Sequence, residues 1–325
     1  MRFIAVEEHF FPPDVQLATN PNPQIRGQNF ERMTEWGAGR VADMDAFGID
    51  MQVLSMPAWT VHEMADDPDE ALRLARKTND TAAAAVEAHP DRFAAFATLP
   101  TSQPDAAADE LERTVKEFGF KGAMIPGHAR GRFLDDQYFW PIFERAQTLD
   151  VPIYLTVHSP PEAVMEAYFS GFTSELSHAL AWGGWGWHCE AGLHSLRLIV
   201  GGLFDRFPDL QIIIGHMGEN IPFALDRADW FLSGNTPHLK RRVAEYFQDN
   251  FYLTTSGWFS VPALQCALAA VGADRILFAI DYPFADSDEG RRFLETAPIS
   301  SADREKIAHG NTERLLRIPP KAASA

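Results

Sequence analysis

Short apolar runs alternate with longer amphipathic stretches along most of the chain. The short runs are rich in branched and aromatic residues, as buried strands are, and they lie at residues 3–6, 52–55, 93–97, 122–125, 152–157, 211–214, 251–254 and 275–280. The amphipathic stretches favour helices, and they lie at residues 39–47, 68–89, 104–118, 138–149, 161–207, 221–232, 261–271 and 301–316. The pattern therefore predicts about eight strands that are separated by helices.

Regular alternation of strands and helices is typical of a parallel sheet, because parallel neighbours need a long crossover connection between them. No two strand-like runs are joined by a short turn signal such as Asn-Gly, so we expect no hairpin. About eight units favour closure into an α/β fold of the (β/α)8 TIM barrel type, with an open doubly wound sheet as the alternative. We therefore predict a single barrel domain with extra helices over residues 1–325, and a loop over its mouth at 20–29.

The chain carries 45 acidic and 28 basic residues, which gives a net charge of −17. An acidic surface repels phosphate backbones, so we expect no nucleic-acid partner. The N-terminal apolar run is too short for a signal peptide, and no run is long enough to cross a membrane. We therefore expect a cytoplasmic protein. Cys189 and Cys266 match neither a disulfide framework nor a zinc motif, so we expect two buried, reduced thiols.

Polar residues follow several of the predicted strands at the point where each apolar run ends. In a barrel these positions converge on one face, where such folds carry their active sites. Glu7 and His9 are two residues apart, so their side chains point to the same face of an extended strand. Carboxylates and imidazoles that converge from several strands indicate a site for Zn, Mn, Fe or Mg. The other strand-end candidates are Glu8, Thr156, His158, His216, residues 254–256 and Asp281.

His216 and Glu219 lie in the segment GHMGEN, directly after the sixth predicted strand. A histidine that is oriented by a nearby carboxylate can act as a general acid or base. The alternative is that Glu219 caps the following helix, where the helix dipole favours a carboxylate. Arg227, within that helix, could bind a substrate carboxylate through two parallel hydrogen bonds. Its alternative is a salt bridge to Asp226 or Asp229.

One segment is unusually rich in aromatic residues. It contains Trp182, Trp185 and Trp187 and is followed at once by His188. Such a run more often packs in a core than lines a pocket, because aromatic side chains bury large apolar areas. We therefore expect these residues to be structural.

Five segments carry a resemblance to a known family. They are VEEHF (6–10), LDVPIYL (149–155), FDRFPDLQIIIGHMGEN (204–220), TTSG (254–257) and FAIDYPF (278–284). In these segments the chain resembles the amidohydrolase superfamily. It is most similar to the branch that contains the γ-resorcylate, 2,3-dihydroxybenzoate and 5-carboxyvanillate decarboxylases. The resemblance extends over nearly the whole chain.

The resemblance implies a role for each strand-end candidate. Most amidohydrolases open with His-x-His, whereas this chain has the Glu-x-His of the decarboxylase branch. No lysine ends the fourth predicted strand, where members with two metals carry a bridging ligand, so one metal is implied. The implied roles are metal ligand for Glu7 and His9, ligand and proton donor to the ring for Asp281, catalytic pair for His216 and Glu219, and carboxylate binding for Arg227.

The chain departs from this branch at the end of the fifth predicted strand. The branch has a histidine ligand directly after Tyr-Leu, but this position is Thr156 here and the histidine is His158. Two residues of strand correspond to ~6.6 Å, which is more than a metal–nitrogen bond of ~2.1 Å can absorb. We therefore expect the loop to bend so that His158 reaches the metal.

The sequence as a whole predicts a metal-dependent, non-oxidative decarboxylase of a hydroxybenzoate-type acid. We expect one divalent metal, Zn or Mn ahead of Mg or Fe, a small aromatic carboxylic acid as partner, and a homodimer or homotetramer. One alternative is a hydrolase of a lactone, amide or ester, in which Asp281 or His216 activates a metal-bound water. Because of Thr156, a second alternative is a non-catalytic paralogue or partner subunit with an altered metal site.

Overall fold

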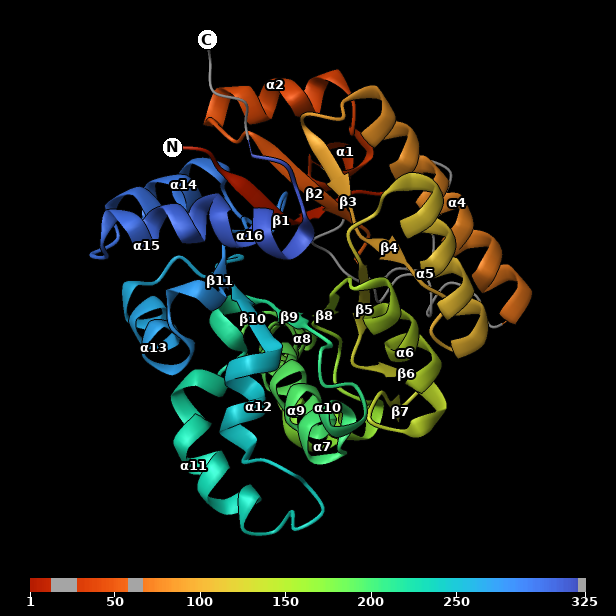
Figure 1. Cartoon of the computed structure of the whole chain (residues 1–325), viewed down its shortest axis with the longest axis vertical. Coiled ribbons are helices and arrows are strands. Elements are labelled where there is room, and N and C mark those ends of the chain that lie inside the picture. Colours follow the sequence, from red (N-terminus) through yellow and green to blue (C-terminus); the bar gives the residue numbers. More distant parts are fainter. Residues whose placement is uncertain (13–27, 58–66, 321–325) are drawn as a thin grey trace.

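The computed structural model describes residues 1–12, 28–57 and 67–320, and in it the apolar runs form parallel strands surrounded by helices (Figure 1). Each strand is short and buried along its length, because helices cover the outside and side chains fill the inside. The parallel strands are β1 (Ile4–His9), β2 (Met51–Ser55), β3 (Phe93–Ala95), β4 (Ala97–Thr98), β5 (Ala123–Pro126), β8 (Ile153–Thr156), β9 (Ile212–Ile214), β10 (Phe251–Thr254) and β11 (Ile276–Leu277).

These strands close into a barrel. They form one sheet of order β1-β2-β3 and another of order β11-β10-β9-β8-β5-β4. The sheets join where β3 runs on into β4, because Phe96 N–H donates to the Leu54 carbonyl and Ala97 N–H donates to the Gly122 carbonyl. On the other side, His9 N–H donates to the Tyr282 carbonyl over 2.8 Å. With β3 and β4 taken as one strand, the predicted (β/α)8 barrel is confirmed over the described residues.

Side chains alternate between the inside of the barrel and the helix layer around it. Ile213 points inward and joins a cluster with Tyr154 and Phe96, whereas Ile212 and Ile214 pack outward in the main core. This alternation is the two-residue period of a strand. The barrel therefore has a filled interior, and any site must lie at one of its ends.

Most predicted helices are present close to their expected bounds, but the stretch 161–207 is not one helix. Residues with little helical preference divide it, among them Gly171 and Gly202, whose φ angles are +94° and +81°. Within the described residues, no helix is both long and apolar enough to cross a bilayer. The helices of three or more turns or of functional interest are α2 (Ala38–Phe47), α4 (Pro68–Ala88), α5 (Pro104–Phe118), α6 (Trp140–Leu149), α7 (Glu162–Phe169), α8 (Ser174–Ala181), α9 (Gly186–Val200), α11 (Ile221–Ser233) and α13 (Val261–Val271).

Several elements were not expected from the pattern. A small antiparallel hairpin joins β6 (His128–Ala129) to β7 (Arg132–Phe133), with Arg130 and Gly131 at φ of 52° and 78° in its turn. The expectation of no hairpin was therefore wrong, because an Arg-Gly turn lacks the usual sequence signal. Most of the predicted loop at 20–29 lies outside the described residues. The other unexpected helices are α1 (Gln28–Thr34), α12 (Val243–Asn250) and α14 (Ser287–Thr296), whereas α10 (Leu203–Arg206) lies within the predicted helical stretch 161–207. The predicted C-terminal helix divides into α15 (Ser301–Glu305), η5 (Lys306–Gly310) and α16 (Asn311–Leu316).

A fully buried arginine ties helix α2 to the first two strands. Arg40 donates to the His9 carbonyl over 2.7 Å and to Gln52 Oε1 over 2.6 Å. Its guanidinium also lies over the Tyr282 ring, 4.4 Å from the ring centroid. Gln52 in turn lies 3.4 Å from Glu8, a carboxyl group whose pKa is raised by burial to about 8. One side chain thus supports the strand that carries Glu7 and His9.

We predict that Arg40→Met lowers the free energy of unfolding by about 3–5 kcal/mol, because it leaves buried acceptors without their charged donor. Denaturant unfolding of the purified variant measures the change. The matched control is Arg73→Met on α4, an exposed arginine whose ion pair with Glu70 lies in water, and this variant should unfold almost as the parent does. Equal unfolding midpoints for the two variants would contradict a supporting role for Arg40.

Candidate metal centre and active-site cavity

A β-bulge in the first strand aims the Glu-x-His motif. Ala5 pairs with Gln52 and Glu8 with Leu54, so β1 has one more residue than β2 between these two pairs. An extra residue changes which face of the sheet the following side chains point to. Val6 therefore lies in the barrel interior, and Glu7 and His9, although odd-numbered like the outward Ala5, reach the cavity at the barrel mouth.

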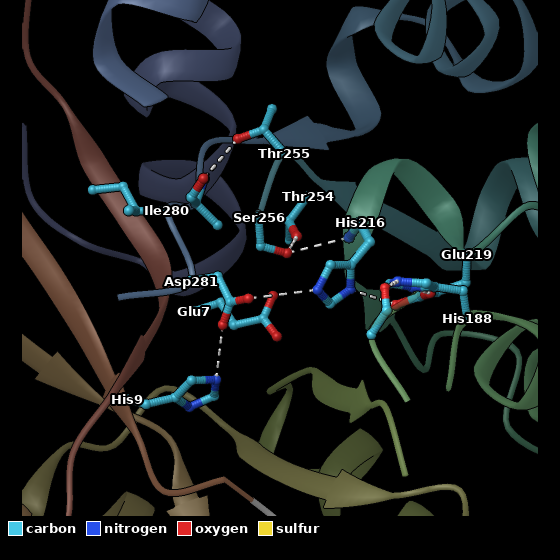
Figure 2. A network of polar contacts seen from close by, with 12 residues as sticks. Glu7, His9, His188, His216, Glu219, Thr254, Thr255, Ser256, Ile280 and Asp281 are labelled. Atoms are coloured by element: carbon cyan, nitrogen blue, oxygen red, sulfur yellow. Dashed lines mark hydrogen bonds and ion pairs between the residues drawn. The ribbon is translucent and has the colours of Figure 1, made fainter. Parts of the chain in front are cut away.

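The cavity of about 380 Å³ at this end of the barrel contains the three ligand candidates from the first and last strands. Glu7 and His9 come from β1, and Asp281 follows β11 with a φ of 74°. Each offers an atom within 4.8 Å of the atoms that the other two offer, and His9 Nε2 lies 3.3 Å from Asp281 Oδ1. Figure 2 shows the three side chains turned toward one another. The structure thus brings Glu7, His9 and Asp281 together as predicted.

The surroundings of these side chains fit a metal. His9 Nδ1 is 3.2 Å from Ser55 Oγ, which leaves Nε2 to face Asp281. The Tyr154 hydroxyl donates to Glu7 Oε2. Metal ligands are commonly held by such outer hydrogen bonds. Two carboxylates and one imidazole form a donor set that suits Mn²⁺ or Zn²⁺.

Burial acts against the charges of the two carboxylates, with different outcomes. Desolvation raises the pKa of Glu7 above its ordinary value. Desolvation acts on Asp281 as well, but hydrogen bonds from His216 and His9 outweigh it and lower the pKa of Asp281. A divalent cation between the two groups would compensate the negative charge that burial makes costly.

The predicted pair of His216 and Glu219 lies on the opposite side of the cavity from His9. His216 Nδ1 is 2.7 Å from Glu219 Oε1, and His216 Nε2 is 3.7 Å from Asp281 Oδ2. Figure 2 shows His216 between the two carboxylates. Glu219 is thus the partner of a histidine and not a helix cap, because the N-cap of α11 is Asn220.

The backbone that carries this pair is strained. His216, Met217, Glu219 and Asn220 all have positive φ, between 49° and 65°, and Gly218 has a φ of 91°. Non-glycine residues rarely adopt this region, and runs of them persist only where the surroundings hold them. One such contact is the hydrogen bond from His216 N–H to Ser256 Oγ at 3.2 Å.

Burial and neighbouring charges shift the pKa of His216 in opposite directions. Desolvation lowers the pKa of His216, but the charge of Glu219 and a hydrogen bond to Asp281 outweigh it, so that the pKa is raised well above its ordinary value. Desolvation likewise opposes ionisation of Glu219, but the charge of His216 and the hydrogen bond from His188 keep the pKa of Glu219 low. These contacts favour the protonated form of His216, whose Nε2 lies 3.7 Å from Asp281 Oδ2.

A second histidine, which was not expected here from the sequence, lies beside this pair. His188 and Trp187, which were expected to be structural, both line the cavity. His188 Nδ1 lies 2.8 Å from Glu219 Oε2, so Glu219 is shared by two imidazoles. His188, His216 and Glu219 also form a group with ligand-type spacing, but their atoms are engaged in hydrogen bonds to each other. The aromatic-rich segment carried no periodic signal that separates a cavity wall from core packing.

His158 does not join the ligand group. Thr156 and Val157 line the cavity, whereas His158 is not among its lining residues. Its Nδ1 is 2.9 Å from the Ser159 carbonyl, and its ring packs against His128 with the centroids 4.3 Å apart. Burial lowers the pKa of His158 to about 4. The expected bend of the loop toward the metal is absent, because contacts with His128 and with the Ser159 carbonyl hold the His158 ring away from the ligand group.

Arg227 is not among the residues that line the cavity of a single chain. Its guanidinium stacks on its own helix, 4.9 Å from the Trp230 ring centroid and 4.1 Å from that of Phe231. The alternative salt bridge is not formed with Asp229 either, because that carboxylate pairs with Arg242. A cation over an aromatic face explains its position.

Comparison with known proteins places this site in a family. The sequence model of the amidohydrolase family matches residues 4–318. A γ-resorcylate decarboxylase from Polaromonas sp. is 38% identical, over 97% of this chain and 98% of that protein. A crystal structure of dihydroxybenzoic acid decarboxylase from Polaromonas sp., with bound manganese and the inhibitor 2-nitroresorcinol, superposes with a TM-score of 0.88 at 38% identity and covers 97% of each chain.

A second solved structure carries a related activity. The 5-carboxyvanillate decarboxylase of Sphingomonas paucimobilis is 34% identical, with a TM-score of 0.89, and the match covers 98% of this chain and 99% of that one. The barrel, the carboxylate–imidazole group at its mouth and the family match all agree. The chain therefore belongs to the amidohydrolase family.

Proposed function

We propose that this protein is a metal-dependent, non-oxidative decarboxylase of a hydroxybenzoate-type acid. The observation that carries the proposal is the convergence of Glu7, His9 and Asp281 at one cavity, with His216 Nε2 3.7 Å from Asp281 Oδ2. Relatives that match over nearly the whole chain are decarboxylases of dihydroxybenzoic acids and of 5-carboxyvanillate. We infer the same class of substrate for this chain.

Glu7, His9 and Asp281 would hold the metal. At the end of β8 the ligand position is occupied by Thr156, and His158 does not join the ligand group. When bound, a divalent ion supplies a Lewis acid and a template for the substrate carboxylate and a neighbouring hydroxyl. Three protein ligands are the usual number where a metal must also accept a substrate. We propose Mn²⁺ or Zn²⁺, because both accept mixed oxygen and nitrogen donors.

Asp281 is the proposed proton donor. The proton bonds to the ring carbon that bears the carboxylate, which interrupts the aromatic ring. The bond to the carboxylate then breaks, its electron pair restores the ring, and CO₂ leaves. The reaction consumes one proton in each turnover and needs no redox cofactor, since the protonated ring accepts the electron pair.

The proton on Asp281 must come from elsewhere, because its own pKa is lowered. His216 Nε2 lies 3.7 Å from Asp281 Oδ2, and although burial opposes a charge on His216, Glu219 and Asp281 raise its pKa. His216 is therefore the proposed source of the proton, and Glu219 orients it. Substrate binding would have to bring the two groups to hydrogen-bond distance.

The walls of the cavity suit a flat aromatic ring. Trp187, Trp258 and Phe284 line it together with the titratable groups. Aromatic walls bind an aromatic ring by stacking and by excluding water, while the few polar groups orient it. A hydrolase of a lactone, amide or ester would also use a metal at this position, and release of an acid or alcohol from such esters without CO₂ release would identify it.

We also propose that the enzyme is a cytoplasmic homo-oligomer. Phe223, Trp230 and Phe231 are exposed on α11, with Phe223 91% exposed, and exposed aromatic groups of this kind are typical of subunit contacts. Light scattering on the purified chain should give a mass that is a whole-number multiple, greater than one, of 36.3 kDa. A monomer would contradict the proposal.

Both cysteines are free, as expected. The expectation that they are buried was wrong, because Cys189 is exposed and Cys266 is only partly buried.

We predict that removal of metal with a chelator abolishes CO₂ release and that Mn²⁺ or Zn²⁺ restores it. Glu7→Gln should lower the bound metal per chain well below that of the parent, because a carboxylate ligand is replaced by a neutral amide. Elemental analysis measures this directly. Glu70→Gln is the matched control, because the exposed Glu70 lies on α4 and pairs with Arg73 at the surface. Equal loss of metal in both variants would contradict the assignment of Glu7.

We predict that Asp281→Asn lowers kcat for decarboxylation by about 10²–10⁴-fold, the range that general acids contribute. The asparagine keeps an oxygen that can contact the metal but has no acidic proton. Release of CO₂ from a panel of ortho-hydroxybenzoates, with metal content measured in parallel, tests this. Asp274→Asn, at an exposed aspartate far from the cavity, serves as control. A metal-loaded Asp281→Asn variant with parental kcat would rule out this proton donor.

A further inference from the structure

The carboxylate of Glu219 has two imidazole partners, and the proposed proton transfer uses only one of them, His216. The Glu219 side chain is completely buried, and each of its oxygens faces the Nδ1 of a different histidine. His216 takes Oε1 at 2.7 Å and His188 takes Oε2 at 2.8 Å. Figure 2 shows the three groups in a row that continues to Asp281.

The other nitrogen of His188 determines what its ring can donate. His188 Nε2 lies 3.1 Å from the carbonyl of Gly183. A carbonyl can only accept, so Nε2 must carry a hydrogen. Glu219 Oε2 faces His188 Nδ1 over 2.8 Å, and among the described residues His188 is the hydrogen-bond partner of this oxygen. His188 is thus held at both ring nitrogens, one against the backbone and one against Glu219.

The position of His188 is held from both sides. Its ring packs edge to face on His216, with centroids 4.8 Å apart, and against Trp258 at 5.1 Å. It also sits in the first turn of α9, whose start is tied to the preceding turn through Gly183. A side chain with fixed contacts on its faces and on both nitrogens has one orientation. It is suited to hold a neighbour in place.

We infer that His188 is a positioning residue that holds the Glu219 carboxylate between two imidazoles, so that Glu219 in turn keeps His216 directed at Asp281. The inference rests on the proposed function for its effect on turnover, but the geometry does not depend on it. Without His188, Glu219 would keep one buried charged oxygen without a donor, which is costly. The carboxylate would then rotate or take up a proton, and either change loosens the hydrogen bond to His216.

Three substitutions separate this role from simple space filling. In His188→Asn the side-chain amide nitrogen can take the place of Nδ1 and donate to Glu219. In His188→Gln it takes the place of Nε2 and donates to Gly183 instead. His188→Ala removes both donors. We expect Asn to keep kcat within about 3-fold of the parent, whereas Gln and Ala lower kcat by about 10–100-fold with little change in KM, as loss of an orienting partner does.

The control for a general effect of losing a histidine is His238→Ala. His238 is exposed and donates only to the carbonyl of Val200, away from the cavity. Its kcat and KM should equal those of the parent. Metal content should also be equal in all variants, because His188 contacts none of the three ligand candidates. Parental kcat in His188→Ala, or equal losses in the Asn and Gln variants, would overturn the inference.

A readout without turnover distinguishes failure of this inference from failure of the proposed function. In protein labelled with ¹⁵N-histidine, NMR reports the hydrogen on each ring nitrogen. The Nδ1–H signal of His216 should be present in the parent, should persist in the Asn variant, and should shift or broaden in the Gln and Ala variants. An unchanged His216 signal in all three would overturn the coupling, even if no hydroxybenzoate is a substrate.

Discussion

The seam between the first and last strands is the constraint on which the site depends. Glu8 Oε1 accepts a hydrogen bond from Ile280 N–H, which joins residues that are 272 positions apart, and His9 N–H donates to the Tyr282 carbonyl. These bonds place the end of β1 directly beside Asp281. Without closure of the barrel, the two halves of the ligand group would lie on opposite edges of an open sheet. The same hydrogen bonds that complete the fold therefore assemble the metal centre.

Within this frame the site is a balance of buried charges. Glu7 and Glu219 are buried and Asp281 is partly buried, and an uncompensated buried charge is costly. His216 and His188 supply hydrogen bonds on one side, and a divalent cation would supply charge on the other. The left-handed backbone from His216 to Asn220 is a further cost that the fold tolerates here. The arrangement is consistent with the proposed role of these groups in proton transfer.

Local patterns were sufficient for most of the barrel. Strands such as β9 and helices such as α5 appear at their expected positions. Burial on both faces of a strand and the amphipathic period of a helix are both visible as patterns in consecutive residues. The misses have local causes as well. Half of the residues of helix α14 are charged and few are apolar, so no helix was predicted there. The β6–β7 turn contains Arg130, a residue type that does not usually indicate a positive φ.

The sequence by itself determined the barrel, the Glu-x-His motif, the last-strand aspartate and the pairing of His216 with Glu219. Each of these depends on neighbours in the chain or on the regular convergence of strand ends. Only the tertiary structure decided that His188 enters the cavity, that His158 packs on His128 and that Arg227 lies outside a single chain's cavity. The physical reason is that loops and helix faces are oriented by contacts between distant segments, which residue spacing does not encode.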